Sequence, residues 1–119
     1  MPALLLSSDL MLSSKVTAAG TRSSVNVATA MNVEALLTKA TELSPALVIL
    51  DLGTSGAEPA KLVGELRALA RPPRAIVAFG PHVQTEKLEQ AAAAGCDEVF
   101  TRGQFHAQAD AILARYAGD

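Results

Sequence analysis

Aromatic side chains and cysteine are both scarce in this sequence. Aromatic residues make up 3% of the chain, whereas 50% of it is hydrophobic, so a core must be built mainly from Ala, Val, Leu and Ile. The only cysteine, Cys96, excludes an internal disulfide and a cysteine-rich zinc site. With no disulfide to form, the reducing cytoplasm is the expected location.

Long apolar runs and clustered positive charge are missing as well. No segment approaches the roughly 20 apolar residues of a membrane-spanning helix. The apolar start, Met1–Leu6, is too short for the core of a signal peptide and has no basic residues before it. The ten lysines and arginines are scattered through a chain of net charge -2, which argues against a nucleic-acid footprint. We therefore expect neither nucleic acid nor a membrane as a partner.

Short apolar runs instead alternate with stretches of helical periodicity along the whole chain. Three apolar runs are typical of buried strands: Ala3–Leu6, Ala46–Asp51 and Ala75–Phe79. Ser24–Thr29 alternates polar and apolar residues, as an edge strand does, and Asp97–Thr101 is a weaker, more exposed fifth strand. Five helices are expected after them: about Leu10–Ala19 ending at Gly20, Val33–Leu43, a third from Glu58-Pro59 to Arg71-Pro72-Pro73, Thr85–Ala94, and about Gln104–Tyr116. This alternation predicts one α/β domain over residues 1–119, with a five-stranded parallel sheet and helices on both faces. The flavodoxin-like strand order 2-1-3-4-5 is the leading topology.

Polar residues and glycine mark several of the expected helix ends. Ser8 or Asp9 can cap the first helix, because either side chain can accept hydrogen bonds from the free amides of the first turn. Asn32 is placed to cap the second helix in the same way. Gly95 fits the left-handed position that commonly ends a helix.

One carboxylate stands out, at the end of the third expected strand. The run Ala46–Leu50 is uninterrupted and apolar, which is typical of a strand buried on both faces of a parallel sheet. It ends on Asp51, and the glycine-bounded loop Leu52–Gly56 follows at once. Because open α/β sheets place their sites at the carboxyl edge, Asp51 is the leading candidate for a functional residue.

Two segments resemble the receiver domain of two-component response regulators, and the resemblance covers nearly all of the chain. Leu47-Val-Ile-Leu-Asp51 is similar to the strand that carries the phospho-acceptor aspartate. Ala93-Ala-Gly-Cys-Asp-Glu98 is similar to the segment before the fifth strand of that family. The resemblance implies that Asp51 is the phospho-acceptor and that Mg²⁺ is the cofactor.

The metal-binding positions depart from the family pattern. The pair of acids that helps to hold Mg²⁺ in receivers falls on Ser7 and Ser8, and only the next residue, Asp9, is acidic. Mg²⁺ is held mainly by carboxylates, whose charge a serine hydroxyl does not supply. Asp9 and Asp51 remain as weak metal ligands, and no tight binding of Mg²⁺ or of another cofactor is expected.

The phosphate-binding positions differ too. The serine or threonine of the fourth strand falls on Gly80, and the lysine of the fifth strand falls on Arg102. Phosphoryl transfer to an aspartate brings negative charge onto negative charge, and cations must neutralise it. These departures predict a pseudo-receiver in which Asp51 forms a permanent ion pair with Arg102, a contact for which the forked guanidinium is well suited.

The resemblance also implies a face for protein partners on the fourth helix, fifth strand and fifth helix. The position of the aromatic switch residue falls on Val99, unless Phe100 takes that part. The other candidates on this face are Glu86, Lys87, Gln90, Gln108 and Arg115. A histidine kinase, a downstream regulator or a second copy of the chain is the expected partner.

Three functions remain open from the sequence. The first, which we favour, is a non-enzymatic signalling module that acts by protein–protein interaction, with impaired or no phosphorylation. The second is a working phospho-receiver that uses Asp51 with a degraded Mg²⁺ site. The third is a small-ligand binder on the same fold. For the third, the turn after the first strand lacks the G-x-G-x-x-G pattern of a dinucleotide site.

Overall fold

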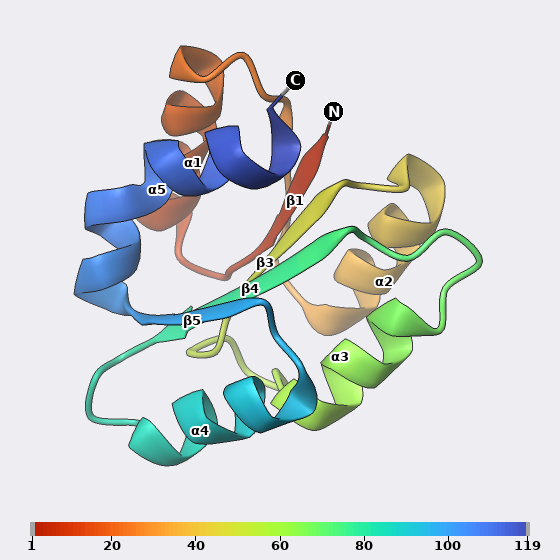
Figure 1. The fold of residues 1–119 in the computed structure, drawn as a ribbon, viewed down its shortest axis with the longest axis vertical. Helices are drawn as coiled ribbons and strands as arrows, with labels where there is room; N and C mark the ends of the chain where they lie inside the picture. The colour runs from red at the N-terminus through yellow and green to blue at the C-terminus, as the bar shows by residue number, and fades with distance from the viewer. Residues whose placement is uncertain (1, 119) are drawn as a thin grey trace.

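The computed structural model describes residues 2–118 and contains five strands that alternate with five helices. The strands are β1 (Ala3–Leu6), β2 (Val27–Ala30), β3 (Leu47–Asp51), β4 (Ala75–Gly80) and β5 (Glu98–Thr101). The helices are α1 (Leu10–Arg22), α2 (Val33–Leu43), α3 (Pro59–Arg67), α4 (Thr85–Ala94) and α5 (Arg102–Ala117). All strands are parallel and lie in the order β2-β1-β3-β4-β5 (Figure 1). The predicted α/β class and strand order are confirmed.

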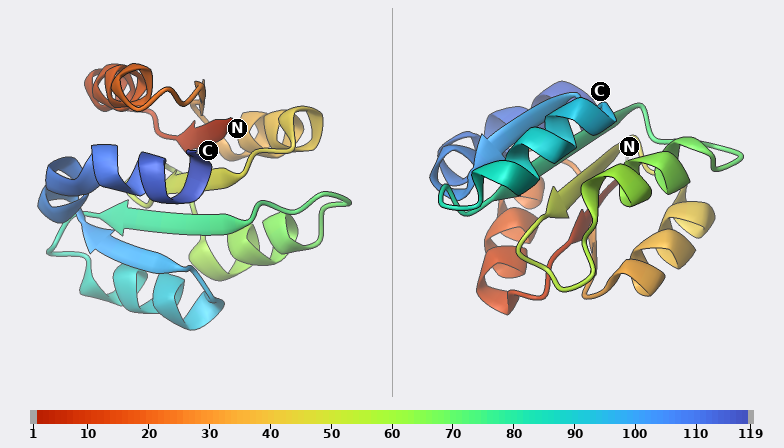
Figure 2. Two further views of the ribbon diagram at one scale, coloured as in Figure 1. Left: turned by 45° about the horizontal axis from the view of Figure 1, so that its top comes forward. Right: turned by 90° about the horizontal axis from the view of Figure 1, so that it is seen from below.

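Two hydrophobic clusters lie on opposite faces of the sheet, because successive side chains of a strand point to opposite faces. On one face Leu5 and Ile49 pack against α1 and α5. On the other face Leu4 and Leu50 pack against α2, α3 and α4. Figure 2 shows the sheet between these two layers of helices. As β3 is central and covered on both faces, every one of its residues is buried, including Asp51.

A stacked pair of aromatic rings joins α5 to the sheet. The ring centroids of Phe79 on β4 and Phe105 on α5 lie 4.2 Å apart, with 9° between the ring planes. Both side chains are fully buried. Phe79 is also the partner of Asp51 in the register of β3 and β4, so this packing supports the edge of the sheet that carries the candidate site.

Helix α1 is longer than the sequence indicates. It runs through Gly20 to Arg22, so the prediction that Gly20 ends it was wrong. The glycine serves close packing instead: a Cβ atom there would lie 2.6 Å from Cγ2 of Val27 and 2.7 Å from the carbonyl oxygen of Val25. Gly20 lets the chain that enters β2 pass directly against the helix, a role that a helical pattern alone does not reveal.

The ends of two other helices also differ from the prediction by a few residues. Helix α3 ends at Arg67, before the expected Arg71, and α5 begins at Arg102, two residues before the expected Gln104. Two amino-terminal caps are as predicted: Asp9, one of the two candidates, caps α1 and Asn32 caps α2 through their side chains. Gly95 ends α4 with a φ of 103°, in the left-handed region. No helix within residues 2–118 is long and apolar enough to cross a membrane.

Candidate functional site

Asp51 lies at the carboxyl edge of the central strand with both carboxylate oxygens hydrogen-bonded. The Ser7 hydroxyl donates to Oδ2 at 2.8 Å, and the Gly53 amide donates to Oδ1 at 2.9 Å. Only 4% of Asp51 and 1% of Ser7 is exposed. The two donors to the carboxylate are thus neutral: one follows β1, and the other lies in the loop directly after β3.

Ser7 holds this position because it directly follows β1, which lies beside β3 in the sheet. Its hydroxyl also accepts a hydrogen bond from the Asp9 amide at 3.1 Å, and its own amide donates to the Ala30 carbonyl at the end of β2. The proton of the hydroxyl and one of its two lone pairs are therefore used within the protein. Ser8, the second residue at the position of the receiver acid pair, is exposed.

Arg102 forms an ion pair with Asp9, and the predicted pair with Asp51 was wrong. The Arg102 guanidinium lies 2.7 Å from Oδ2 of Asp9. The cause is the start of α5: Thr101 and Gln104 form a capping box that begins the helix immediately after β5. Arg102 consequently occupies the first helical position, beside α1. The sequence pattern Thr-x-x-Gln over residues 101–104 could have located this cap.

Asp9 has three donors around its side chain. The amides of Leu12 and Met11 donate to Oδ1, and Arg102 donates to Oδ2. The pKa of the Asp9 carboxyl is lowered, first by the Leu12 hydrogen bond and then by the charge of Arg102 and the Met11 hydrogen bond. The side chain is a helix cap and an ion-pair partner rather than a free ligand.

These residues do not form a donor set that suits Mg²⁺. The ion prefers several oxygen ligands in near-octahedral geometry, with carboxylates among them. Here the Ser7 hydroxyl is bonded to Asp51, and the Asp9 carboxylate is bonded to α1 and Arg102. Over residues 2–118, no three His, Cys, Asp or Glu side chains gather closely enough to hold a metal ion.

Two further residues shape the edge beside Asp51. A Cβ atom at Gly80 would lie 3.3 Å from Cβ of Leu52, so a serine or threonine at this position would be crowded. The Lys87 ammonium donates to the Leu52 carbonyl oxygen at 3.2 Å. From the sequence, Lys87 was assigned only to the partner face. Its position in the first turn of α4, which follows β4 at the carboxyl edge of the sheet, could have indicated the contact with Leu52.

Thr54, in the loop after Asp51, carries a buried hydroxyl that has no hydrogen-bond partner among residues 2–118. The residue is 2% exposed. We expect Thr54→Val to raise the free energy of unfolding by about 1 kcal/mol, because valine has the same shape and removes an unsatisfied polar group. Urea denaturation measures this. Thr54→Ser, which keeps the hydroxyl and loses the methyl group, should destabilise; a loss of stability in the valine variant would contradict the prediction.

The expected partner face is only partly accessible. Glu86, Gln90, Gln108 and Arg115 are exposed on α4 and α5, whereas Lys87 and Val99 are half-buried. Arg115 pairs with Glu98 of β5 at 2.9 Å. Phe100 is 8% exposed and packs in the cluster between the sheet and α5, so it is a core residue and not part of this face.

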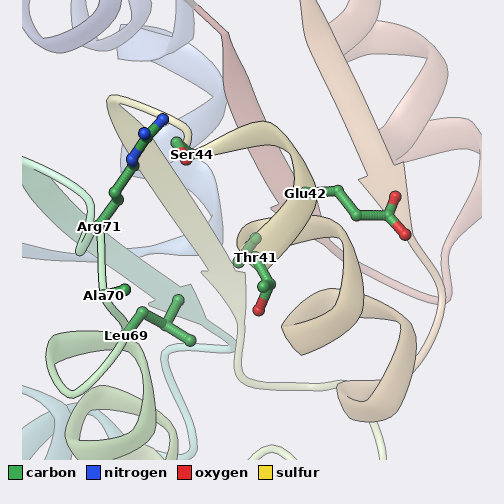
Figure 3. A pocket seen from close by; sticks show the side chains of 7 residues that line it. Thr41, Glu42, Ser44, Leu69, Ala70 and Arg71 are labelled. Carbon is green, nitrogen blue, oxygen red and sulfur yellow. The ribbon is translucent and has the colours of Figure 1, made fainter.

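Cys96 and the hollow near α2 lie apart from the site. Burial raises the pKa of the Cys96 thiol to about 11, which leaves it protonated and unreactive near neutrality. A hollow of about 190 Å³ lies between the end of α2 and the loop after α3, at the opposite edge of the sheet from Asp51. Figure 3 shows Arg71 turned toward Ser44 there, with Glu42 directed away from them.

Comparison with known proteins supports the fold but does not establish a family or an activity. No protein-family model matches the sequence, and no curated protein matches it either. The structure is similar to a response regulator from Hahella chejuensis, with a TM-score of 0.84 and 18% identity over 98% of this chain and 94% of that one. It is also similar to the signal receiver domain of a response regulator from Bermanella marisrubri (TM-score 0.81, 23% identity, 96% and 92% covered). The receiver domain of the putative response regulator NarL from Mycobacterium tuberculosis gives a TM-score of 0.81 at 19% identity, with 99% and 97% covered. At these identities the likeness establishes the flavodoxin-like fold of receiver domains.

Proposed function

We propose that this protein is a receiver-type signalling module that acts through protein contacts, without Mg²⁺-dependent phosphorylation of Asp51 and without enzymatic activity. The observation that supports it most is the hydrogen bond between the Ser7 hydroxyl and Asp51 at 2.8 Å. Ser7 stands at the position where receivers carry a metal-binding acid, and its hydroxyl occupies Oδ2 of Asp51, the candidate phospho-acceptor.

The distribution of cations around Asp51 supports the same proposal. An aspartate oxygen attacks a phosphoryl group only when positive charge offsets the charge that develops. The Arg102 guanidinium is paired with Asp9, and the Lys87 ammonium lies on the Leu52 carbonyl oxygen. Asp51 is in turn held by neutral donors. A fixed hydrogen-bonded edge of this kind suits a module with one conformation.

The partner of such a module is a protein: a histidine kinase, a downstream regulator or a second copy of the chain. The exposed residues of α4 and α5, with Lys87 and Val99 at their margin, are the face that we assign to it. Phosphorylation-dependent switching is not required for such a contact, because the face is present in the resting conformation.

Incubation with acetyl phosphate and Mg²⁺ tests the proposal. We expect intact-mass spectrometry to find no phosphate adduct on the wild-type protein under conditions that fully modify an established receiver domain run in parallel. The reason is that, within the described residues 2–118, neither a metal site nor a free cation faces Asp51.

The variant Asp51→Asn serves as the matched control. A stoichiometric adduct on the wild-type protein that disappears in Asp51→Asn would overturn the proposal and establish the working phospho-receiver instead. An adduct that persists in the variant would lie on another residue, and would leave the prediction for Asp51 intact.

A further inference from the structure

The outer edge of β2 lies in an uncharged groove. Two adjoining hollows of about 550 and 590 Å³ flank this strand, and both are lined by Thr17 and Thr21 from the outer face of α1. Among residues 2–118, none that lines either hollow carries a charge, although 18% of the chain is charged. Two exposed apolar side chains also line them, Leu10 (67% exposed) at the start of α1 and Leu43 (41% exposed) at the end of α2.

The strand presents main-chain groups to this groove. The amides of Ala3 and Ser7 donate to the carbonyl oxygens of Asn26 and Ala30, which therefore face β1. Main-chain groups alternate in direction along a strand, so those of Val27 and Thr29 face outward. An edge that carries free N–H and C=O groups is a template for pairing with another strand.

Lys39 limits how that edge can pair. Its ammonium donates to the carbonyl oxygen of Thr29, which closes one of the outward acceptors. Within residues 2–118, the N–H and C=O of Val27 and the N–H of Thr29 remain without a hydrogen-bond partner. About a twofold axis, Val27 of one chain can exchange two hydrogen bonds with Val27 of another in an antiparallel pair. Val27 is then the outward residue of β2 that still offers both its N–H and its C=O, which favours a register centred on it.

Charge and side-chain size favour a second copy of this chain as the occupant. In a twofold contact the same patch meets itself, so any charged residue near the axis faces its own like charge. Among residues 2–118, those that line the groove are uncharged, and the nearby Lys39 ammonium lies at Thr29, two residues along the strand from Val27 on the axis. The outer face of α1 beside it presents Ser14, Thr17, Ala18 and Thr21, all small enough for two helices to approach closely.

We propose that the protein forms a twofold homodimer through this groove, with antiparallel pairing of β2 at Val27 and with α1 packed against α1 of the second copy. The two sheets then join into one continuous sheet. The contact lies on the opposite side of the molecule from α4 and β5, and it does not depend on the state of Asp51.

Sedimentation velocity over the micromolar range, with a matched pair of variants, tests the proposal. Ala18→Glu places a charge on the groove face of α1, and Ala60→Glu places the same charge on the exposed side of α3, away from both the groove and the α4–α5 face. We expect a dimer for the wild-type protein and for Ala60→Glu. We expect Ala18→Glu to raise the dimer dissociation constant at least roughly tenfold, because like charges then meet across the axis.

Hydrogen exchange gives a second, independent measurement. The amide of Val27 should gain protection as the concentration rises, while exposed amides of α4 should not. A wild-type protein that stays monomeric would overturn the proposal. So would a dimer that tolerates Ala18→Glu, a dimer that both variants disrupt, or exchange at Val27 that does not depend on concentration.

Discussion

The variant Ser7→Asp is expected to lose about 3–5 kcal/mol of unfolding free energy at neutral pH in the absence of divalent ions. The new carboxylate would stand within hydrogen-bonding distance of Asp51, at a position that is 1% exposed. It would remove the only side-chain donor to Asp51 in the described part of the chain and add a second buried negative charge. Urea denaturation followed by circular dichroism measures the loss.

Two neighbouring substitutions separate charge from size in this experiment. In Ser7→Asn, the asparagine has nearly the same shape as the aspartate of Ser7→Asp and can still donate to Asp51. This variant should therefore lose only about 1 kcal/mol of unfolding free energy. Ser8→Asp adds the same charge one residue further along, at an exposed position, and should change stability by less than about 0.5 kcal/mol. Equal losses in Ser7→Asp and Ser7→Asn would show that size, not charge, is responsible.

The dependence of the stability of Ser7→Asp on pH and Mg²⁺ tests whether the two carboxylates repel each other and whether they can bind the ion. Protonation of either carboxyl removes the repulsion, so the stability difference from the wild-type protein should shrink as the pH falls below neutrality. Mg²⁺ should raise the melting temperature of the variant, because a paired carboxylate site suits the ion. A comparable rise in the wild-type protein would contradict our view that its own site is unsuited to Mg²⁺.

The variant Phe105→Ala is expected to lose about 3–5 kcal/mol, the range for removing a fully buried aromatic side chain. The loss of the ring would leave a cavity beside Phe79, 4.2 Å away between centroids, and would loosen α5 from β4. Few other aromatic residues are available to fill it, since they form only 3% of the chain. Thermal and urea unfolding both measure the loss.

Phe105→Leu is the control for this prediction. A leucine fills much of the volume and should cost less than about 1.5 kcal/mol. If Phe105→Ala lost no more than the leucine variant, the stacked pair would not be a main support of the α5 layer. Amide exchange in β4 near Phe79 would show whether the loosening reaches the strand that pairs with Asp51.

The framework of the fold could be predicted because its signals are local. The unbroken apolar run that ends on Asp51, the cap at Asn32 and the glycine at the end of α4 each depend on a few neighbouring residues. Gly20 was misjudged for the converse reason: its role depends on Val25 and Val27, whose approach to α1 becomes visible only when the chain is folded.

The sequence by itself determined the α/β class, the strand order and the position of Asp51 at the carboxyl edge of a buried central strand. It also showed that the residues at the expected metal-binding positions are serines. Only the tertiary structure decided which cation meets which carboxylate. Arg102 pairs with Asp9 and Ser7 bonds to Asp51, because the capping box sets the direction of α5 and the register of β1 sets the reach of Ser7. Such contacts join residues 44 and 93 positions apart, and no local pattern encodes them.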